Sequence, residues 1–144
     1  MQGFQDVVLD EKYRLRIPTK FRSELGNNFV ILQGNDECLS IMSASAFEKF
    51  KAPLMQIPHS DRQARSAARA ILGTVDVPDE DNQGRFVIPA ELRAIAGIEK
   101  KVRLIGFLDT LEVWAEDKLS NIDFAKPGSV ARASDILADN DYSY

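Results

Sequence analysis

Short apolar runs alternate with polar turns along the first half of the chain, a pattern typical of strands and hairpins. Residues 14–17 read polar, apolar, polar, apolar, as expected for a half-buried strand. Apolar runs predict further strands at 7–9, 29–32 and 38–42, with a hairpin loop at 33–37. Pro18 suits the first turn of a short helix over 19–25, because its missing N–H has no helical partner there, and Gly26 ends that helix.

The second half repeats this order of elements. Predicted strands cover 75–77, 85–88, 102–105 and 111–114, and Pro89 begins a helix that Gly97 ends. Two capping boxes, Ser45 with Glu48 and Ser60 with Gln63, predict the starts of two further helices between the halves. The second of these helices has an apolar face and a separate face formed by Arg62, Arg65 and Arg69. We interpret this arginine face as exposed to solvent or in contact with another subunit.

The parallel order reflects an internal repeat. At an offset of 71 residues the identical pairs are Asp10/Asp81, Arg14/Arg85, Ile17/Ile88, Pro18/Pro89 and Arg22/Arg93. We interpret residues 1–58 and 73–125 as two tandem units, 59–72 as a bridging helix and 126–144 as a C-terminal tail. A unit of about 50 residues is too small to fold alone, so the two are expected to complete one core. The predicted fold is α+β and mainly β, a shared β-barrel with peripheral helices.

Charge is distributed unevenly along the chain. The 144 residues carry a formal net charge of −4, which taken alone argues against a nucleic-acid partner. However, residues 12–22 contain five basic and no acidic side chains, whereas residues 107–144 contain eight acidic and three basic ones. The global charge is therefore a poor guide to the partner, and one basic edge is available for DNA.

Several function classes lack the residues that they need. The chain has one cysteine, Cys38, and one histidine, His59, so an intrachain disulfide and a Cys/His zinc cluster are excluded. The sequence contains no glycine-rich phosphate loop, no paired acid and base, and no apolar run of membrane-spanning length. The acidic N-terminus does not resemble a signal peptide. We expect a cytoplasmic protein that is not an enzyme, with no cofactor, metal, membrane partner or small-molecule substrate.

The candidate chemistry lies at the two turns that open on Asp10 and Asp81. Each carboxylate can accept a hydrogen bond from the N–H two residues on, and Gly84 can adopt positive φ at the end of the second turn. Arg14 and Arg85 either close these turns by ion pairs or reach DNA from them, and one geometry can satisfy both. Alternate cations on one strand share a face, so Lys12, Arg14 and Arg16 can form one ridge suited to the major groove. Arg22 and Arg93 can equally pack against carboxylates.

Two motifs in this chain, DEKYRLRIPTKFR and DNQGRFVIPAELR, resemble the MraZ family of bacterial transcriptional regulators. The segments LIGF and LEVW in the second unit, with Arg65 and Arg69 ahead of it, are also similar. The resemblance covers about residues 1–122 and implies two AbrB-like swapped-hairpin units, assembled into rings that bind tandem promoter repeats. Tyr13 stands where the family often has Gly or Asn, which predicts a different geometry for the first turn.

The resemblance implies a sequence-specific DNA-binding regulator that represses its own division and cell-wall operon, located at the nucleoid. Its expected partners are double-stranded promoter DNA and further copies of itself in a ring. The alternative is an antitoxin-like scaffold whose main partner is protein. The predicted turn-positioning residues are Asp10, Asp81 and Gly84. The predicted DNA-binding residues are Lys12, Arg14, Arg16, Lys20, Arg22 and Arg85.

Overall fold

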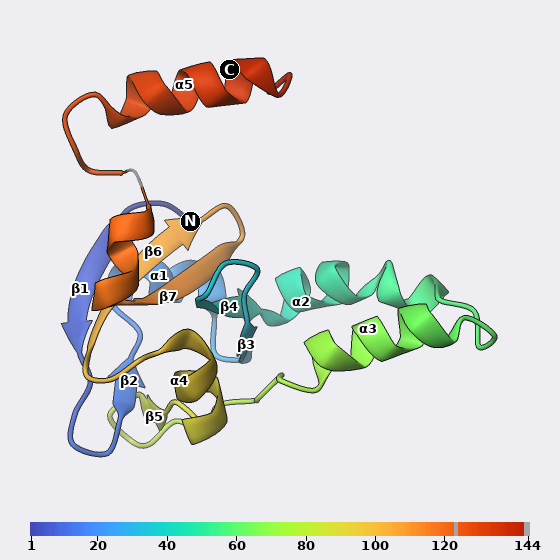
Figure 1. Cartoon of the computed structure of the whole chain (residues 1–144). Coiled ribbons are helices and arrows are strands. Elements are labelled where there is room, and N and C mark those ends of the chain that lie inside the picture. Colours follow the sequence, from blue (N-terminus) through green and yellow to red (C-terminus); the bar gives the residue numbers. More distant parts are fainter. Residues whose placement is uncertain (123, 143–144) are drawn as a thin grey trace.

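A computed structural model describes residues 1–122 and 124–142 (Figure 1). Its main sheet has five antiparallel strands in the order β1-β6-β7-β4-β3. Strands of the two repeats interleave in this sheet, because β1 pairs with β6 and β4 pairs with β7. The two units therefore share one sheet, and neither unit forms a complete sheet by itself. The strand bounds are β1 Phe4–Val8, β3 Phe29–Gln33, β4 Leu39–Ser43, β6 Lys101–Phe107 and β7 Thr110–Ala115.

A separate two-stranded ribbon joins equivalent segments of the two repeats. Strand β2, Arg14–Arg16, pairs antiparallel with β5, Arg85–Val87. Leu15 lies opposite Phe86 in the register, and both side chains are buried in the core. Because side chains alternate along a strand, the other residues of the ribbon lie on its outer face.

Two short helices follow the ribbon strands, as the prolines predicted. Helix α1 spans Thr19–Leu25 after Pro18, and α4 spans Ala90–Ala96 after Pro89. Gly97 ends α4 at a φ of 64°, and Gly26 follows α1 at a φ of 69°. Both helices turn apolar side chains into the one core that also receives the ribbon and the sheet: Phe21, Leu25, Leu92 and Ala96.

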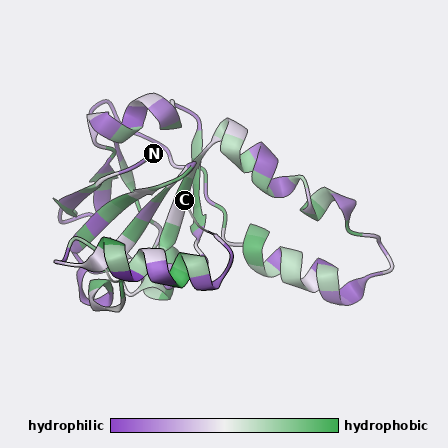
Figure 2. Ribbon diagram, turned by 90° about the horizontal axis from the view of Figure 1, so that it is seen from above, coloured by the Kyte–Doolittle hydropathy of each residue, from purple (hydrophilic) through white to green (hydrophobic). Residues whose placement is uncertain are grey.

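An arm of two helices extends away from the body in both views (Figures 1 and 2). It consists of α2, Ala44–Lys51, the 3₁₀ helix η1, Leu54–Gln56, and α3, Arg62–Leu72. No residue of α3 is buried. The two predicted capping boxes are wrong, because the side chains that accept the capping hydrogen bonds are Ser43 and Asp61.

The C-terminal part adds a 3₁₀ helix, η2, over Glu116–Asn121, and helix α5 over Ser129–Asp139. Helix α5 lies at the end of the molecule opposite the ribbon (Figure 1). No helix among the described residues combines the length and the apolar character needed to cross a membrane.

Three fold predictions need correction. The described strands form an open sheet and a separate ribbon rather than a closed barrel, because β2 and β5 pair only with each other. The fold is α+β, but more of the described residues lie in helices than in strands, so "mainly β" is wrong. The strand predicted at 75–77 is reduced to one bridge between Asp76 and Ile31. Pro78 follows closely and has no N–H with which to extend the pairing.

Candidate nucleic-acid interface

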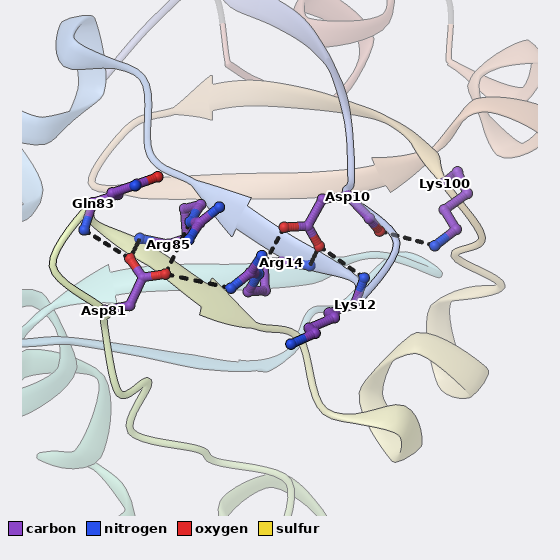
Figure 3. A network of polar contacts seen from close by, with 7 residues as sticks. All are labelled: Asp10, Lys12, Arg14, Asp81, Gln83, Arg85 and Lys100. Atoms are coloured by element: carbon purple, nitrogen blue, oxygen red, sulfur yellow. Dashed lines mark hydrogen bonds and ion pairs between the residues drawn. The ribbon is translucent and has the colours of Figure 1, made fainter.

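The two Asp turns share one hydrogen-bond pattern (Figure 3). Asp10 Oδ1 accepts from the backbone N–H groups of Lys12 and Arg14 at 2.9 and 3.0 Å, and its Oδ2 accepts from Arg14 Nε at 2.6 Å. Asp81 Oδ1 accepts from the N–H groups of Gln83 and Arg85, both at 2.9 Å, and its Oδ2 accepts from Arg85 Nε at 2.9 Å. Each carboxylate therefore closes its turn and holds the arginine four residues on. The hydrogen bonds from the N–H groups two residues after each aspartate, those of Lys12 and Gln83, are therefore present at both turns.

A carboxylate also links the two turns to each other. Asp81 Oδ2 lies 3.5 Å from Arg14 Nη1, so Arg14 sits between Asp10 and Asp81. The backbone hydrogen bond from Arg14 is the largest influence lowering the pKa of Asp10, to about 2, and the corresponding bond from Arg85 lowers the pKa of Asp81. Both aspartates are therefore ionised at neutral pH and keep the two guanidinium groups in fixed positions.

The guanidinium groups keep donors for a ligand. Arg85 uses Nε for Asp81, and within the described part of the chain its two Nη groups have no protein partner. Arg14 likewise gives Nε to Asp10. An arginine oriented in this way can present its Nη edge to the O6 and N7 acceptors of guanine.

Arginines dominate the outer face of the ribbon. Arg14 and Arg16 lie there on β2, and Arg85 and Val87 lie there on β5. Arg16 is directly opposite Arg85 in the register. Like charges in this position destabilise a ribbon unless an anion neutralises them. A two-stranded ribbon also has the dimensions to enter the major groove.

Tyr13 occupies the position equivalent to Gly84, and both have positive φ, 59° and 75°. The N–H of Tyr13 donates to Asp10 O at 2.9 Å, as that of Gly84 does to Asp81 O at 3.0 Å. The prediction of a different geometry for the first turn is therefore wrong. The tyrosine ring lies between two cations, with Arg93 Cζ and Lys100 Nζ each 3.7 Å from its centroid. Lys100 Nζ also donates to Asp10 O at 2.8 Å.

Arg22 forms a bidentate ion pair within the protein. Its Nη1 and Nη2 donate to the two carboxylate oxygens of Glu80 at 2.7 and 2.6 Å, and this pairing raises the pKa of Arg22. The guanidinium also lies over the ring of Phe29, 5.3 Å from its centroid. DNA contact by Arg22 stays a prediction. The alternative, a contact with a carboxylate, is present in the structure as the pair with Glu80.

Each of the two short helices, α1 and α4, contacts the Asp turn of the other unit. Arg22 on α1 holds Glu80, which precedes the Asp81 turn of the second unit, while Arg93 on α4 covers Tyr13 in the turn of the first unit. Sequence reasoning missed Glu80, Arg93 and Lys100 as supports of the site. The available signal was that Arg22 and Arg93 occupy equivalent positions of the repeat. Their partners differ, because Arg22 pairs with a carboxylate and Arg93 lies over an aromatic ring.

The remaining predicted residues lie in different places. Lys12 is exposed on the first turn beside Arg14 (Figure 3). Arg16 lines a groove of about 520 Å³ together with Asn82, Gln83 and Gly84 of the second turn. Lys20 Nζ donates to Phe4 O at 2.5 Å, at the start of β1, whereas the Asp10 turn follows the end of that strand. Arg22 lines the same groove, so the structure brings together every predicted residue except Lys20.

The lone thiol is not placed for catalysis. Cys38 is fully buried, and its burial raises the pKa of the thiol to about 12. A thiol with so high a pKa is almost entirely protonated at neutral pH and is a poor nucleophile.

The sequence matches the family model described as "MraZ protein, putative antitoxin-like" twice, over residues 1–70 and 71–123. It is 39% identical over 110 residues to the transcriptional regulator MraZ of Finegoldia magna, covering 76% of this chain and 77% of the relative. It is 38% identical to the transcriptional regulator MraZ of Thermoanaerobacter pseudethanolicus, over 81% of this chain and 82% of the relative. For that of Micrococcus luteus the identity is 40%, over 74% of each chain.

These relatives are named as transcriptional regulators, which confirms the expectation that the chain is not an enzyme. Each of the two matches of the family model contains one copy of the internal repeat with its Asp turn, and the matches meet between residues 70 and 71, inside the predicted bridge 59–72. The chain therefore belongs to the MraZ family.

Proposed function

We propose that this protein is a sequence-specific transcriptional regulator that inserts the β2–β5 ribbon into the major groove of DNA. The observation that carries the proposal is the pair of arginines on the outer face, each held through Nε by an ionised aspartate of its own turn. Holding the side chains before binding reduces the conformational entropy that is lost when they contact bases.

The outward-facing side chains have distinct roles in this mechanism. Arg14 and Arg85 bond guanine O6 and N7 from the two halves of the ribbon. Lys12 and Arg16, which have no ion pair within the described residues, neutralise phosphates on either side. Phosphate contacts supply affinity and register, while base contacts supply specificity.

One ribbon makes few phosphate contacts, and such binding weakens steeply as salt rises. We infer that several copies act together as a ring-shaped homo-oligomer on tandem promoter repeats. Occupation of repeats upstream of its own division and cell-wall operon would repress that operon. The protein would then act in the cytoplasm, at the nucleoid.

A second candidate function is an antitoxin-like scaffold whose main partner is protein. It is favoured by a groove of about 710 Å³ on one face of β6 and β7, beside the loop between β3 and β4, with an apolar floor and an acidic edge. The floor contains Ile105, Phe107 and Trp114, and the edge contains Asp36 and Glu37. This groove and the ribbon are separate surfaces, so a protein partner there would not exclude DNA.

Substitution of Arg14 tests the proposed function. We expect Arg14→Ala to weaken binding to the promoter of the protein's own operon by about 5- to 150-fold, because one bidentate guanine contact is lost at each site. The measurement is a mobility-shift titration over a salt series, with thermal melting to verify the fold. Lys49→Ala is the matched control, since it removes one exposed positive charge from α2 in the arm. Equal binding by wild type and Arg14→Ala would refute the proposal.

A further inference from the structure

The internal repeat makes the two halves of the ribbon comparable residue by residue. Arg14 corresponds to Arg85 at the offset of 71, whereas Lys12 corresponds to Gln83 and Arg16 to Val87. In the first unit the central arginine is therefore flanked by two outward-facing cations. The equivalent positions of the second unit carry an amide and an apolar side chain. A ribbon with twofold-related backbones thus presents two chemically different halves.

Among the residues of β2 and β5, Val87 is the one apolar residue on the outer face of the ribbon. It lies directly opposite Arg14 in the register, and 49% of it is exposed. Its neighbours in the pairing, Leu15 and Phe86, are at most 1% exposed because they point inward. A valine half in water beside an arginine adds nothing to the core that the ribbon covers.

We propose that Val87 determines specificity by packing against the methyl group of a thymine next to the guanine read by Arg14. This inference rests on the proposed function. Thymine is the one base that displays a methyl group in the major groove, and an apolar side chain is the group that recognises it there. Directly paired residues of a ribbon are separated by about 4.5–5.5 Å, which places the two contacts on the same or adjacent base pairs.

The consequence for the binding site is a fixed direction. The half that contains Arg14 and Arg16 contacts guanine and phosphate, and the half that contains Arg85 and Val87 contacts guanine and thymine. One protomer therefore reads an asymmetric sequence rather than a palindrome. Copies arranged head to tail then require repeats that run in the same direction.

Replacement of single thymines by deoxyuridine tests this, because the exchange removes only the methyl group. The probe is a duplex selected in vitro from random sequence by the full-length protein, and dissociation constants are measured by fluorescence anisotropy at fixed salt. We expect one thymine per site at which uracil weakens wild-type binding by about fourfold, the effect of exposing one buried methyl group. Val87→Ala should bind the thymine duplex more weakly by a similar factor and lose the sensitivity to uracil.

Two variants sharpen the experiment. Val77→Ala removes a valine that is 73% exposed and lies outside the ribbon, so it should keep the full uracil effect. Val87→Arg restores the residue found in the first unit, and it should abolish the uracil effect and steepen the salt dependence. Thermal melting verifies that each variant is folded.

The inference is overturned if no thymine is sensitive to uracil, or if Val87→Ala retains the full uracil effect. Its failure is distinguishable from that of the proposed function. If Arg14→Ala loses binding while no thymine is sensitive, only the role of Val87 is wrong. If Arg14→Ala binds as wild type does, the ribbon is not the DNA-binding element and both proposals fail.

Discussion

Tyr13 shows how one side chain can offset an unfavourable backbone. A bulky residue at positive φ is costly, by roughly 1–2 kcal/mol, and the equivalent position of the second unit has glycine. The ring recovers this cost through two cations, Arg93 and Lys100, each 3.7 Å from its centroid, and through contact with the core. The sequence indicated the strain but not the contacts that compensate for it.

Two substitutions of Tyr13 separate the ring from the backbone. Tyr13→Ala should lower the free energy of unfolding by about 2 kcal/mol, because both cation–π contacts are lost while the positive φ remains. Tyr13→Gly loses the same ring but relieves the backbone, so it should be about 1 kcal/mol more stable than Tyr13→Ala. Chemical denaturation at fixed protein concentration measures both. Equal stability of the two variants would show that the turn does not require positive φ.

At the same scale, local interactions were predictable and distant ones were not. The hydrogen bonds from Lys12 and Gln83 to their aspartates follow from the Asx-turn rule, which spans two residues. The ion pair of Arg22 with Glu80 joins residues 58 positions apart. Nothing in a single sequence identifies which of many carboxylates will meet Arg22, because that depends on how the two units interleave.

Helix positions were predictable from proline, glycine and apolar spacing, but the capping residues were not. Ser45 and Ser60 satisfy the capping-box motif, yet Ser43 and Asp61 accept the hydrogen bonds. Ser43 ends β4 directly, so α2 starts as soon as the strand stops, and Ser45 already lies inside the helix. The sequence motif alone cannot distinguish Ser43 from Ser45 as the capping residue, because it does not specify where the strand ends.

The two serines provide a paired test at the level of this element. Ser43→Ala should lower the free energy of unfolding by about 1 kcal/mol, because the N–H of Ala46 loses its capping acceptor. Ser45→Ala is the control, and it should change stability by less than about 0.5 kcal/mol, since alanine is the better helix former. Both are measured by urea denaturation. A larger loss for Ser45→Ala would restore the capping-box assignment.

Across the whole molecule, charge is separated by position in the fold. The ribbon with its arginines lies at one end, and the acidic η2 and α5 lie toward the other (Figure 1). The outer face of the ribbon carries Arg14, Arg16 and Arg85, so a chain with a net charge of −4 still presents basic side chains there. Composition could not reveal this, because it contains no information on which end of the fold a charge occupies.

Interleaving was predictable only in outline. The small size of each repeat implied a shared core, and β1–β6 and β4–β7 pairing confirms that the two units share a sheet. That the sheet stays open depends on β2 and β5 pairing with each other, which the repeat alone does not specify. The projecting arm with an unburied α3 also lies beyond sequence reasoning, since an amphipathic pattern does not specify what the apolar face packs against.

The number of operator repeats tests the molecule as an assembly. If copies of the ribbon are joined in one oligomer, each repeat bound raises the local concentration of the next ribbon. A duplex with three repeats should then bind about 10²- to 10⁴-fold more tightly than a duplex with one. Anisotropy titrations with duplexes of equal length and fixed salt measure the difference, with the missing repeats replaced by unrelated sequence.

The control keeps three repeats and inserts about five base pairs between neighbours, which is half a helical turn of DNA. The repeats then face opposite sides of the duplex, so a rigid oligomer can engage them only by twisting the DNA. The gain over a single repeat should therefore fall sharply, although the number of binding sequences is unchanged. Equal affinity for one repeat and for three in phase would contradict linked binding. Each ribbon would then have to supply the full affinity from its own few arginines.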